Sequence, residues 1–226
     1  RELRDLSSLP EFAPTLDRSH RVRRVGLYDR AVNTAERTVV RHDYGLRYLT
    51  PYRTEFEAAA KAHDVDVALL YGIARQESRF ASDIVSSAGA VGLMQLMPGT
   101  AKWVAKQLAR SDYQPGQIAN AELNTQFGAF YFKYWLERLD RMQALAAAAY
   151  NAGPGRAQAW RPQAPLEGAI WVETIPFNET RDYVKKVLAN AVVYGQSLRS
   201  DTQPLTTRLG VVAPRNGAVA SVAAAG

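Results

Sequence analysis

Apolar side chains recur at helical spacing along most of this chain of 226 residues, and polar residues fill the positions between them. The alternation of apolar and polar residues that marks a half-buried strand does not extend over any length. The pattern predicts a helix that ends at Glu77 and further helices at 54–63, 98–110, 120–139, 142–150, 155–160 and 178–198. We therefore expect an all-α, compact domain without internal repeats.

Residues that satisfy the free backbone groups of helix ends stand beside these predicted helices. N-caps are expected at Asp64 or Asp66, Asn120 and Asn178, a first-turn proline at Pro98, and a C-terminal cap at Gly153. The Ala-rich helix 142–150 is expected at the centre of the bundle, because small side chains let neighbouring helices approach closely.

The chain divides into three parts. Residues 1–48 hold a linker with two prolines (1–16) and one or two helices (17–43) whose partial apolar face is too small to fold alone. Residues 49–200 have the size of one ordinary domain. Residues 201–226 are rich in Ala, Val, Gly and Thr, carry only three charges, and are predicted to be a disordered tail.

Glu77 is the residue whose position most needs an explanation. It follows Ile73 by four residues and Leu70 by seven, so it extends the apolar face of its helix. It also stands at the helix C-terminus, where the dipole disfavours a negative charge. Both effects raise the pKa of a carboxyl group, as a general acid requires. Spacing alone favours the simpler interpretation, an ion pair with Arg75 or Arg79.

A run of aromatic residues lies in the predicted helix 120–139. Its members are Phe127, Phe130, Tyr131, Tyr134 and Trp135. Such a run could form a wall on which sugars stack, but helical spacing is more typical of core packing.

Composition excludes several kinds of function. The chain has no cysteine, which excludes disulfides and thiolate metal sites, and its histidines, His20, His42 and His63, match no metal-ligand spacing. The net charge of +6 is spread along the chain rather than gathered in a basic block, so a nucleic-acid partner is not expected. No apolar run has the length of a membrane span. We expect no metal and no cofactor.

Four sequence blocks occur in a fixed order. They are E-S-R-F from Glu77, G-L-M-Q-L-M-P from Gly92, A-A-Y-N-A-G-P-G-R at 148–156, and E-T-I-P-F-N-E-T-R-D-Y-V at 173–184. Together they resemble the soluble lytic transglycosylases that cut bacterial peptidoglycan, over roughly residues 50–200. The resemblance implies a lysozyme-like catalytic domain, preceded in larger members by a long helical domain whose end residues 17–43 resemble.

The resemblance also implies roles for individual residues. Glu77 is the single catalytic acid and base, and Glu179 is a carboxylate lining the site. Glu179 lies in the first turn of a helix, where the dipole stabilises its ionised form; the alternative is a capping residue or a partner of Arg181. The remaining substrate contacts are Ser86 (with Ser87 as an adjacent alternative), Gln95, Met97 (with core packing as an alternative), Tyr150 and Asn151.

The implied reaction cleaves the bond between MurNAc and GlcNAc and closes a 1,6-anhydro ring on MurNAc. The expected partner is therefore a peptidoglycan glycan strand, and the expected location is the periplasm of a Gram-negative bacterium. Two alternatives remain open: a hydrolytic muramidase of the goose-lysozyme kind, and a weakly catalytic glycan-binding module. The sequence specifies no oligomeric state.

Overall fold

The computed structural model describes residues 19–21, 23–24, 26–37, 43–200 and 202–215. The elements, in chain order, are α2 (Tyr28–Glu36), α3 (Tyr44–Arg47), α4 (Arg53–His63), α5 (Val67–Glu77), α6 (Pro98–Gln107), the 3-10 helix η2 (Pro115–Ala119), α7 (Ala121–Arg138), α8 (Gln143–Ala152), α9 (Pro154–Ala159), β1 (Leu166–Glu167), α10 (Gly168–Thr174), α11 (Asn178–Leu198), α12 (Leu205–Leu209) and β2 (Val211–Val212). The predicted all-α class is confirmed, with one pair of two-residue strands, β1 and β2, as the sheet among the described residues.

Most predicted helix ends are confirmed by their hydrogen bonds. The Asp66 side chain accepts from the Ala68 N–H and the Asn120 side chain from the Leu123 N–H, while Pro98 opens α6. Each satisfies, or removes, a backbone N–H that has no partner within its helix.

Two further end residues were predicted. Gly153 ends α8 with a φ of +91°, a value that favours glycine. The prediction for Asn178 is wrong by one position, because Asn178 is the first helical residue of α11 and Phe177 is the N-cap, which makes no side-chain capping bond.

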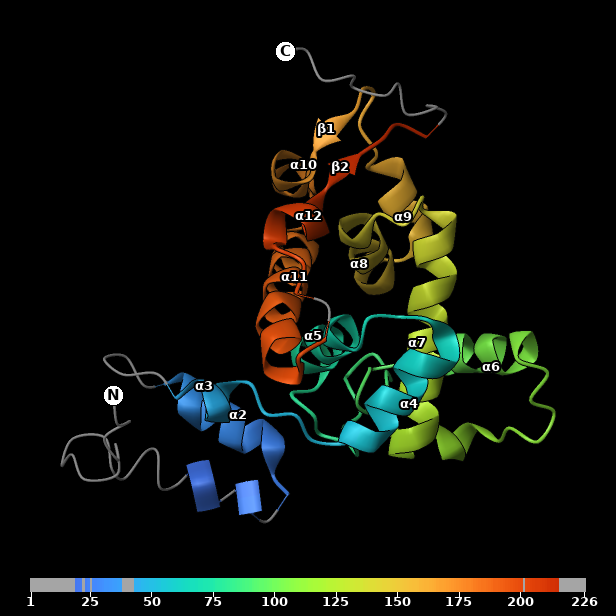
Figure 1. The fold of residues 1–226 in the computed structure, drawn as a ribbon. Coiled ribbons are helices and arrows are strands. Elements are labelled where there is room, and N and C mark those ends of the chain that lie inside the picture. Colours follow the sequence, from blue (N-terminus) through green and yellow to red (C-terminus); the bar gives the residue numbers. More distant parts are fainter. Residues whose placement is uncertain (1–18, 22, 25, 38–42, 201, 216–226) are drawn as a thin grey trace.

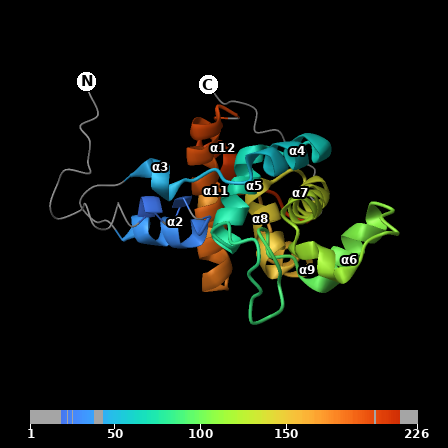
Figure 2. The ribbon, with the colours of Figure 1, turned by 90° about the horizontal axis from the view of Figure 1, so that it is seen from below.

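Helix α5 lies in the interior and packs along α11 (Figures 1 and 2). Every residue from 68 to 75 is buried, so α5 has no solvated face over this stretch. Gly72 sets the distance between the two helices: a Cβ at this position would lie 2.6 Å from the Val187 carbonyl oxygen. The missing side chain therefore lets the two backbones touch.

Helix α8 is the second buried helix, as its alanines predicted. Residues 144–149 are fully buried, and α8 packs against α7, α9 and α11. In both views α5 and α8 lie between α11 and α7 (Figures 1 and 2).

A separate apolar cluster joins α6, η2 and α7. Its buried members are Leu96, Ala101, Val104, Ala105, Ile118 and Phe127. Of the predicted aromatic run, Phe127 is fully buried in this cluster, whereas Phe130, Tyr131, Tyr134 and Trp135 are only partly buried. The run therefore serves partly as core and partly as surface.

The N-terminal piece has its own small core. Ala31, Val32 and Ala35 of α2 are buried against Leu46 and Leu49. The helical character predicted for residues 17–43 is confirmed at α2, whereas α3 begins just after that range and was not predicted. The linker predicted at 1–16 lies outside the described residues.

The prediction of a disordered tail is wrong for residues 202–215. Strand β2 pairs antiparallel with β1, and Val212 is fully buried. Arg208 of α12 is buried too, and its Nη2 lies 2.8 Å from the Asp66 carboxylate. Residues 216–226 lie outside the described part. The prediction failed for two reasons. The apolar stretch is too short to show a periodic pattern, and the burial of Arg208 depends on a carboxylate that is distant in the sequence.

Gly72→Ala should destabilise the fold by about 1–3 kcal/mol, because the added methyl group meets backbone rather than a side chain that could move. The measurement is the free energy of unfolding in urea. Gly155→Ala is the matched control, since no atom lies within 4 Å of a Cβ built at this helical glycine. Equal stability of the two variants would contradict the proposed helix contact.

Candidate active site

Glu77 is the last residue of α5, and the chain turns sharply after it. Ser78 caps the helix, and the next two residues, Arg79 and Phe80, both have positive φ angles, +49° and +69°. Two consecutive non-glycine residues in the left-handed region are strained, and such strain persists only where the surroundings fix the backbone.

Core contacts fix one side of this turn. The Ser78 hydroxyl donates to the Leu93 carbonyl at 2.8 Å and accepts from the Phe80 N–H at 3.0 Å. The Phe80 ring is buried, with the Tyr71 and Phe56 rings as neighbours. The turn is thereby bonded to the long loop that lies between α5 and α6.

The Glu77 carboxylate meets a tyrosine from α11. The Tyr183 hydroxyl donates to Glu77 Oε1 at 2.6 Å. The pKa of Glu77 is raised to about 7: burial raises it most, the Tyr183 hydrogen bond opposes this with a smaller lowering effect, and the charge of Glu179 adds a smaller increase. Glu77 can thus exchange a proton near neutral pH, as predicted from its position on the apolar face.

In the sequence, Tyr183 shares its helical spacing with Val187 and Ala191, which places it on an apolar, inward face of α11 and by itself gives no further sign of a role. The tyrosine is indeed buried, and burial raises its own pKa well above the ordinary value, so it remains a hydrogen-bond donor to Glu77. Its place at the end of the fourth sequence block was the signal for a role in the site.

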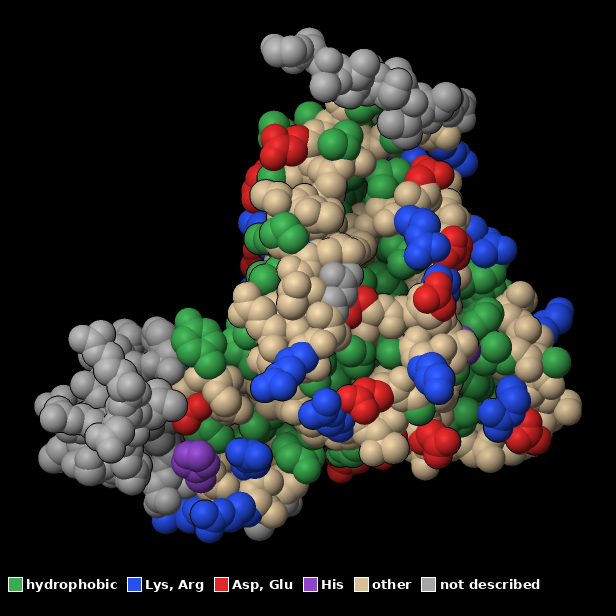
Figure 3. Space-filling view, in the orientation of Figure 1, with side chains coloured by type: hydrophobic (Ala, Val, Ile, Leu, Met, Phe, Trp, Pro, Cys, Tyr) green, Lys and Arg blue, Asp and Glu red, His purple; other side chains and the backbone are tan. Residues whose placement is uncertain are grey.

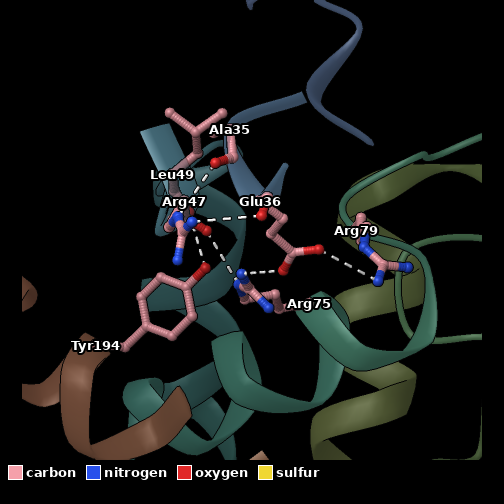
Figure 4. A network of polar contacts seen from close by, with 7 residues as sticks. All are labelled: Ala35, Glu36, Arg47, Leu49, Arg75, Arg79 and Tyr194. Atoms are coloured by element: carbon pink, nitrogen blue, oxygen red, sulfur yellow. Dashed lines mark hydrogen bonds and ion pairs between the residues drawn. The ribbon is translucent and has the colours of Figure 1, made fainter. Parts of the chain in front are cut away.

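The simpler interpretation of Glu77 as an ion-pair partner is wrong. Arg75 and Arg79 both contact Glu36 instead, at 2.7 Å and 3.5 Å (Figure 4). Glu77 therefore accepts a hydrogen bond from Tyr183 and is influenced by the charge of Glu179.

Glu179 lies in the first turn of α11, one turn before Tyr183, and is exposed. Arg181 does not pair with it, because the Arg181 guanidinium donates twice to the Ile175 carbonyl, at 2.7 and 3.2 Å. The pairing alternative for Glu179 is thus wrong, whereas its charge does act on Glu77.

Tyr150 and Asn151, at the end of α8, are both engaged by the protein. The Tyr150 hydroxyl donates to the Met94 carbonyl at 2.8 Å rather than to Glu77, although the charge of Glu77 contributes to raising the Tyr150 pKa. Asn151 Oδ1 accepts from the Thr180 hydroxyl at 2.7 Å. These bonds tie α8 to the loop and to the first turn of α11.

The loop after α5 carries Gln95 and Met97. Gln95 has a φ of +46°, and its amide donates to the Gly92 carbonyl at 2.8 Å and, more weakly, to the Ile84 carbonyl at 3.3 Å. Gly92 is needed there because a Cβ would lie 2.5 Å from the Asn124 amide nitrogen. Met97 is 43% exposed, so the core-packing interpretation of it is wrong.

The two neighbouring serines of the loop differ. The Ser86 hydroxyl accepts from the Ala90 N–H at 2.9 Å and closes a tight turn, while Ser87 is exposed. Ser86 therefore has a fixed position and still carries its own O–H as a donor.

A hollow of about 280 Å³ lies beside this loop. It is lined by Gly99, Thr100, Trp103, Tyr131 and Trp135. The Tyr131 ring centroid is 5.4 Å from that of Tyr150. The aromatic residues that line the hollow are therefore connected, through Tyr150, with the residues around Glu77.

The rest of the described chain offers little competing chemistry. Across the described ranges there is no group of three or more His, Asp or Glu residues that could hold a metal ion. Nor does any helix in this part of the chain combine the length and apolar character needed to cross a membrane. On the face shown in Figure 3, basic and acidic side chains are interspersed.

Two family models match the chain. The one described as "Transglycosylase SLT domain" matches residues 54–169, and the one described as "Soluble lytic transglycosylase helical domain" matches residues 174–202. The second match falls on α11 rather than on the N-terminal helices.

Known proteins are similar over much of the chain. A soluble lytic murein transglycosylase of Salmonella typhimurium is 39% identical over 151 residues, which cover 66% of this chain and 23% of that protein. The solved structure of an inactive Glu-to-Gln mutant of lytic transglycosylase Slt from Pseudomonas aeruginosa has a TM-score of 0.78 and 36% identity, covering 83% of this chain and 30% of that one. The 70 kDa soluble lytic transglycosylase of Escherichia coli has a TM-score of 0.73 and 29% identity, covering 85% of this chain and 31% of that one. The chain thus spans less than a third of the length of each.

Tyr183→Phe should raise the pKa of Glu77 above its value of about 7, because the hydrogen bond that favours the ionised carboxylate is lost. The pKa can be measured by NMR titration of ¹³C-labelled glutamate side chains. Tyr113→Phe, which removes a buried hydroxyl without a partner in the described part of the chain, should leave the Glu77 pKa unchanged. An unchanged or lowered pKa in Tyr183→Phe would show that the hydroxyl does not act on Glu77.

Proposed function

The chain belongs to the transglycosylase SLT domain family, whose model matches half of it, and we propose that it is a lytic transglycosylase that cleaves the β-1,4 bond between MurNAc and GlcNAc in peptidoglycan. The observation that carries the proposal is the environment of Glu77. One partly buried carboxyl group, with its pKa raised to about 7, is suited both to give a proton and to take one back.

Protonated Glu77 is the general acid in the first step. It donates its proton to the glycosidic oxygen, the C1–O bond of MurNAc breaks, and GlcNAc leaves with a hydroxyl group. The Tyr183 hydrogen bond stabilises the carboxylate that this step produces.

The Glu77 carboxylate is the general base in the second step. It takes the proton of the C6 hydroxyl of the same MurNAc, and O6 bonds to C1, which closes the 1,6-anhydro ring and returns Glu77 to its protonated form. Because the nucleophile belongs to the substrate, the attack is intramolecular and gains the corresponding entropic advantage. Neither a second catalytic carboxylate nor a cofactor enters this scheme, and Glu179 acts on the site through its charge.

The remaining site residues are proposed to bind the glycan. Ser86 is proposed to donate its hydroxyl to the MurNAc acetamide, since it is fixed by the Ala90 N–H and keeps its own proton. Exposed Met97 offers an apolar contact, and Gln95 and Asn151 offer amide groups. Tyr150 is proposed to support the loop next to Glu77 through its bond to Met94.

The names of the related proteins support the substrate class and the use of a single glutamate. The Salmonella typhimurium protein is named a soluble lytic murein transglycosylase, and one Glu-to-Gln exchange accompanies the inactive Pseudomonas aeruginosa form. We extend these properties to this chain, and we propose the periplasm of a Gram-negative bacterium as its location.

Digestion of sacculi should release fragments that end in 1,6-anhydro-MurNAc, each lighter by one water than the hydrolytic product. Mass spectrometry of the released muropeptides measures this directly. Fragments that carry only reducing MurNAc ends would instead assign the chain to the hydrolytic muramidases.

Glu77→Gln should reduce the clearance of sacculi by roughly 10³–10⁴-fold, because glutamine keeps the size of the side chain but cannot exchange a proton. Binding to sacculi should persist. Glu122→Gln, at an exposed position in the first turn of α7, is the control and should clear sacculi at the wild-type rate. A Glu77→Gln protein that clears sacculi at near the wild-type rate would reject Glu77 as the catalytic residue, and with it the acid–base mechanism proposed above.

The same variant has a predicted dependence of stability on pH. The pKa of Glu77 is raised on folding, so its protonated form is favoured in the native state, and this contribution to stability is lost as pH rises through about 7. Glu77→Gln should therefore melt close to wild type at pH 4 and at a higher temperature at pH 8.

A further inference from the structure

Glu36, the last residue of α2, uses both carboxylate oxygens to contact the end of α5. Oε1 lies 2.7 Å from Arg75 Nη2, and Oε2 lies 3.5 Å from Arg79 Nη2. These arginines stand two residues before and two residues after Glu77. Figure 4 shows the carboxylate between the two guanidinium groups.

Arg75 is held almost entirely by the N-terminal piece. Its side chain is only 9% exposed, its Nε donates to the Arg47 carbonyl at 3.0 Å, and its guanidinium lies 4.6 Å from the centroid of the Tyr48 ring. A buried guanidinium needs a charged partner, and Glu36 supplies it.

Arg79 is held less fully. Its side chain is 42% exposed, while its Nε is buried and has no hydrogen-bond partner within the described ranges. Glu36 is therefore the acidic group that fixes the direction of this side chain, at a residue whose own backbone has a φ of +49°.

Glu36 itself is held in place by the same piece. Arg47 donates through Nε to the Ala35 carbonyl at 3.2 Å and through Nη2 to the Glu36 carbonyl at 3.3 Å, at the C-terminus of α2. Figure 4 shows these bonds beside the Glu36 side chain. The carboxylate is thus presented from a fixed helix end.

We propose that Glu36 is a positioning residue for the reaction: through Arg75 and Arg79 it holds the strained turn after Glu77, so that the Glu77 carboxyl group keeps its place relative to the substrate. The inference rests on the proposed function of Glu77. Ser78 and Phe80 hold the turn from the core side, and Glu36 holds it from the side of the N-terminal helices. A displaced carboxyl group lowers the rate of proton transfer more than it lowers glycan binding.

Glu36→Gln tests the proposal in the full chain, with a soluble peptidoglycan oligosaccharide as substrate. We expect kcat to fall on the order of tenfold while KM stays within about twofold, as for a group that orients the reacting atoms. Amide hydrogen exchange at residues 78–81 should quicken in the same variant, and this second measurement requires no substrate. Activity is assayed well below the melting temperature of each variant.

Glu57→Gln is the matched control, because it breaks a glutamate–arginine pair at 2.7 Å on α4, with Arg53 as the partner. Both kcat and hydrogen exchange at 78–81 should be unchanged in it. A Glu36→Gln protein that keeps wild-type kcat, or one that loses activity through KM alone, would overturn the proposal.

Arg79→Gln is a second test that serves if the Glu36 variant does not fold. It leaves the pair between Glu36 and the buried Arg75 intact. It should also lower kcat. The double variant Glu36→Gln/Arg79→Gln should lose no more than Glu36→Gln alone, because Glu36→Gln already removes the contact that Arg79→Gln breaks. Wild-type kcat in a folded Arg79→Gln, or multiplicative losses in the double variant, would overturn the proposal. Absence of activity in the wild type would instead reject the proposed function, leaving the exchange measurement as the test of the contact.

Discussion

The backbone contact between α5 and α11 at Gly72 is the constraint on which the site depends. Because no side chain separates the helices there, the two axes approach closely enough for Val187 and Gly72 to be in contact. Tyr183 lies one turn before Val187 on α11, and at this spacing its hydroxyl reaches the Glu77 carboxylate at the end of α5. Wider spacing would leave a buried carboxyl group and a buried phenol without partners, which is costly.

The two ends of α5 are fixed by parts of the chain outside the central bundle. At the N-terminus, Asp66 caps the helix with one carboxylate oxygen and pairs with Arg208 of α12 through the other. At the C-terminus, Arg75 pairs with Glu36 of α2. Buried ion pairs of this kind add little net stability but penalise alternative arrangements, because each unpaired charge would remain in the interior. The helix that carries Glu77 is therefore set in its orientation along its whole length.

Part of the strained backbone lies around Glu77, although residues at other helix ends, such as Asp140 and Arg141 after α7, also have positive φ angles. Arg79, Phe80 and Gln95 have positive φ angles and belong to the turn or to the loop next to it. Hydrogen bonds from the Ser78 hydroxyl and the Gln95 amide hold these conformations. A fixed loop offers preorganised polar groups to a substrate, and such groups need not reorganise during the reaction.

The sequence by itself determined the helices, most of their caps and the identity of Glu77 as the acidic residue on an apolar face, because these follow from local periodicity and from the blocks around 77, 92, 148 and 173. It did not determine which partner each buried polar group would have. Tyr183 lies 106 residues from Glu77 in the chain, and Arg208 lies 142 from Asp66, so no local pattern relates them. An inward-facing tyrosine has the same helical spacing whether its hydroxyl meets a carboxylate or not, and an arginine in a short apolar tail gives no sign that it will be buried. Only the packing of α5 against α11, and of α2 and α12 against the two ends of α5, decided these pairs. A buried charge or hydroxyl takes whichever partner the fold brings within hydrogen-bond distance.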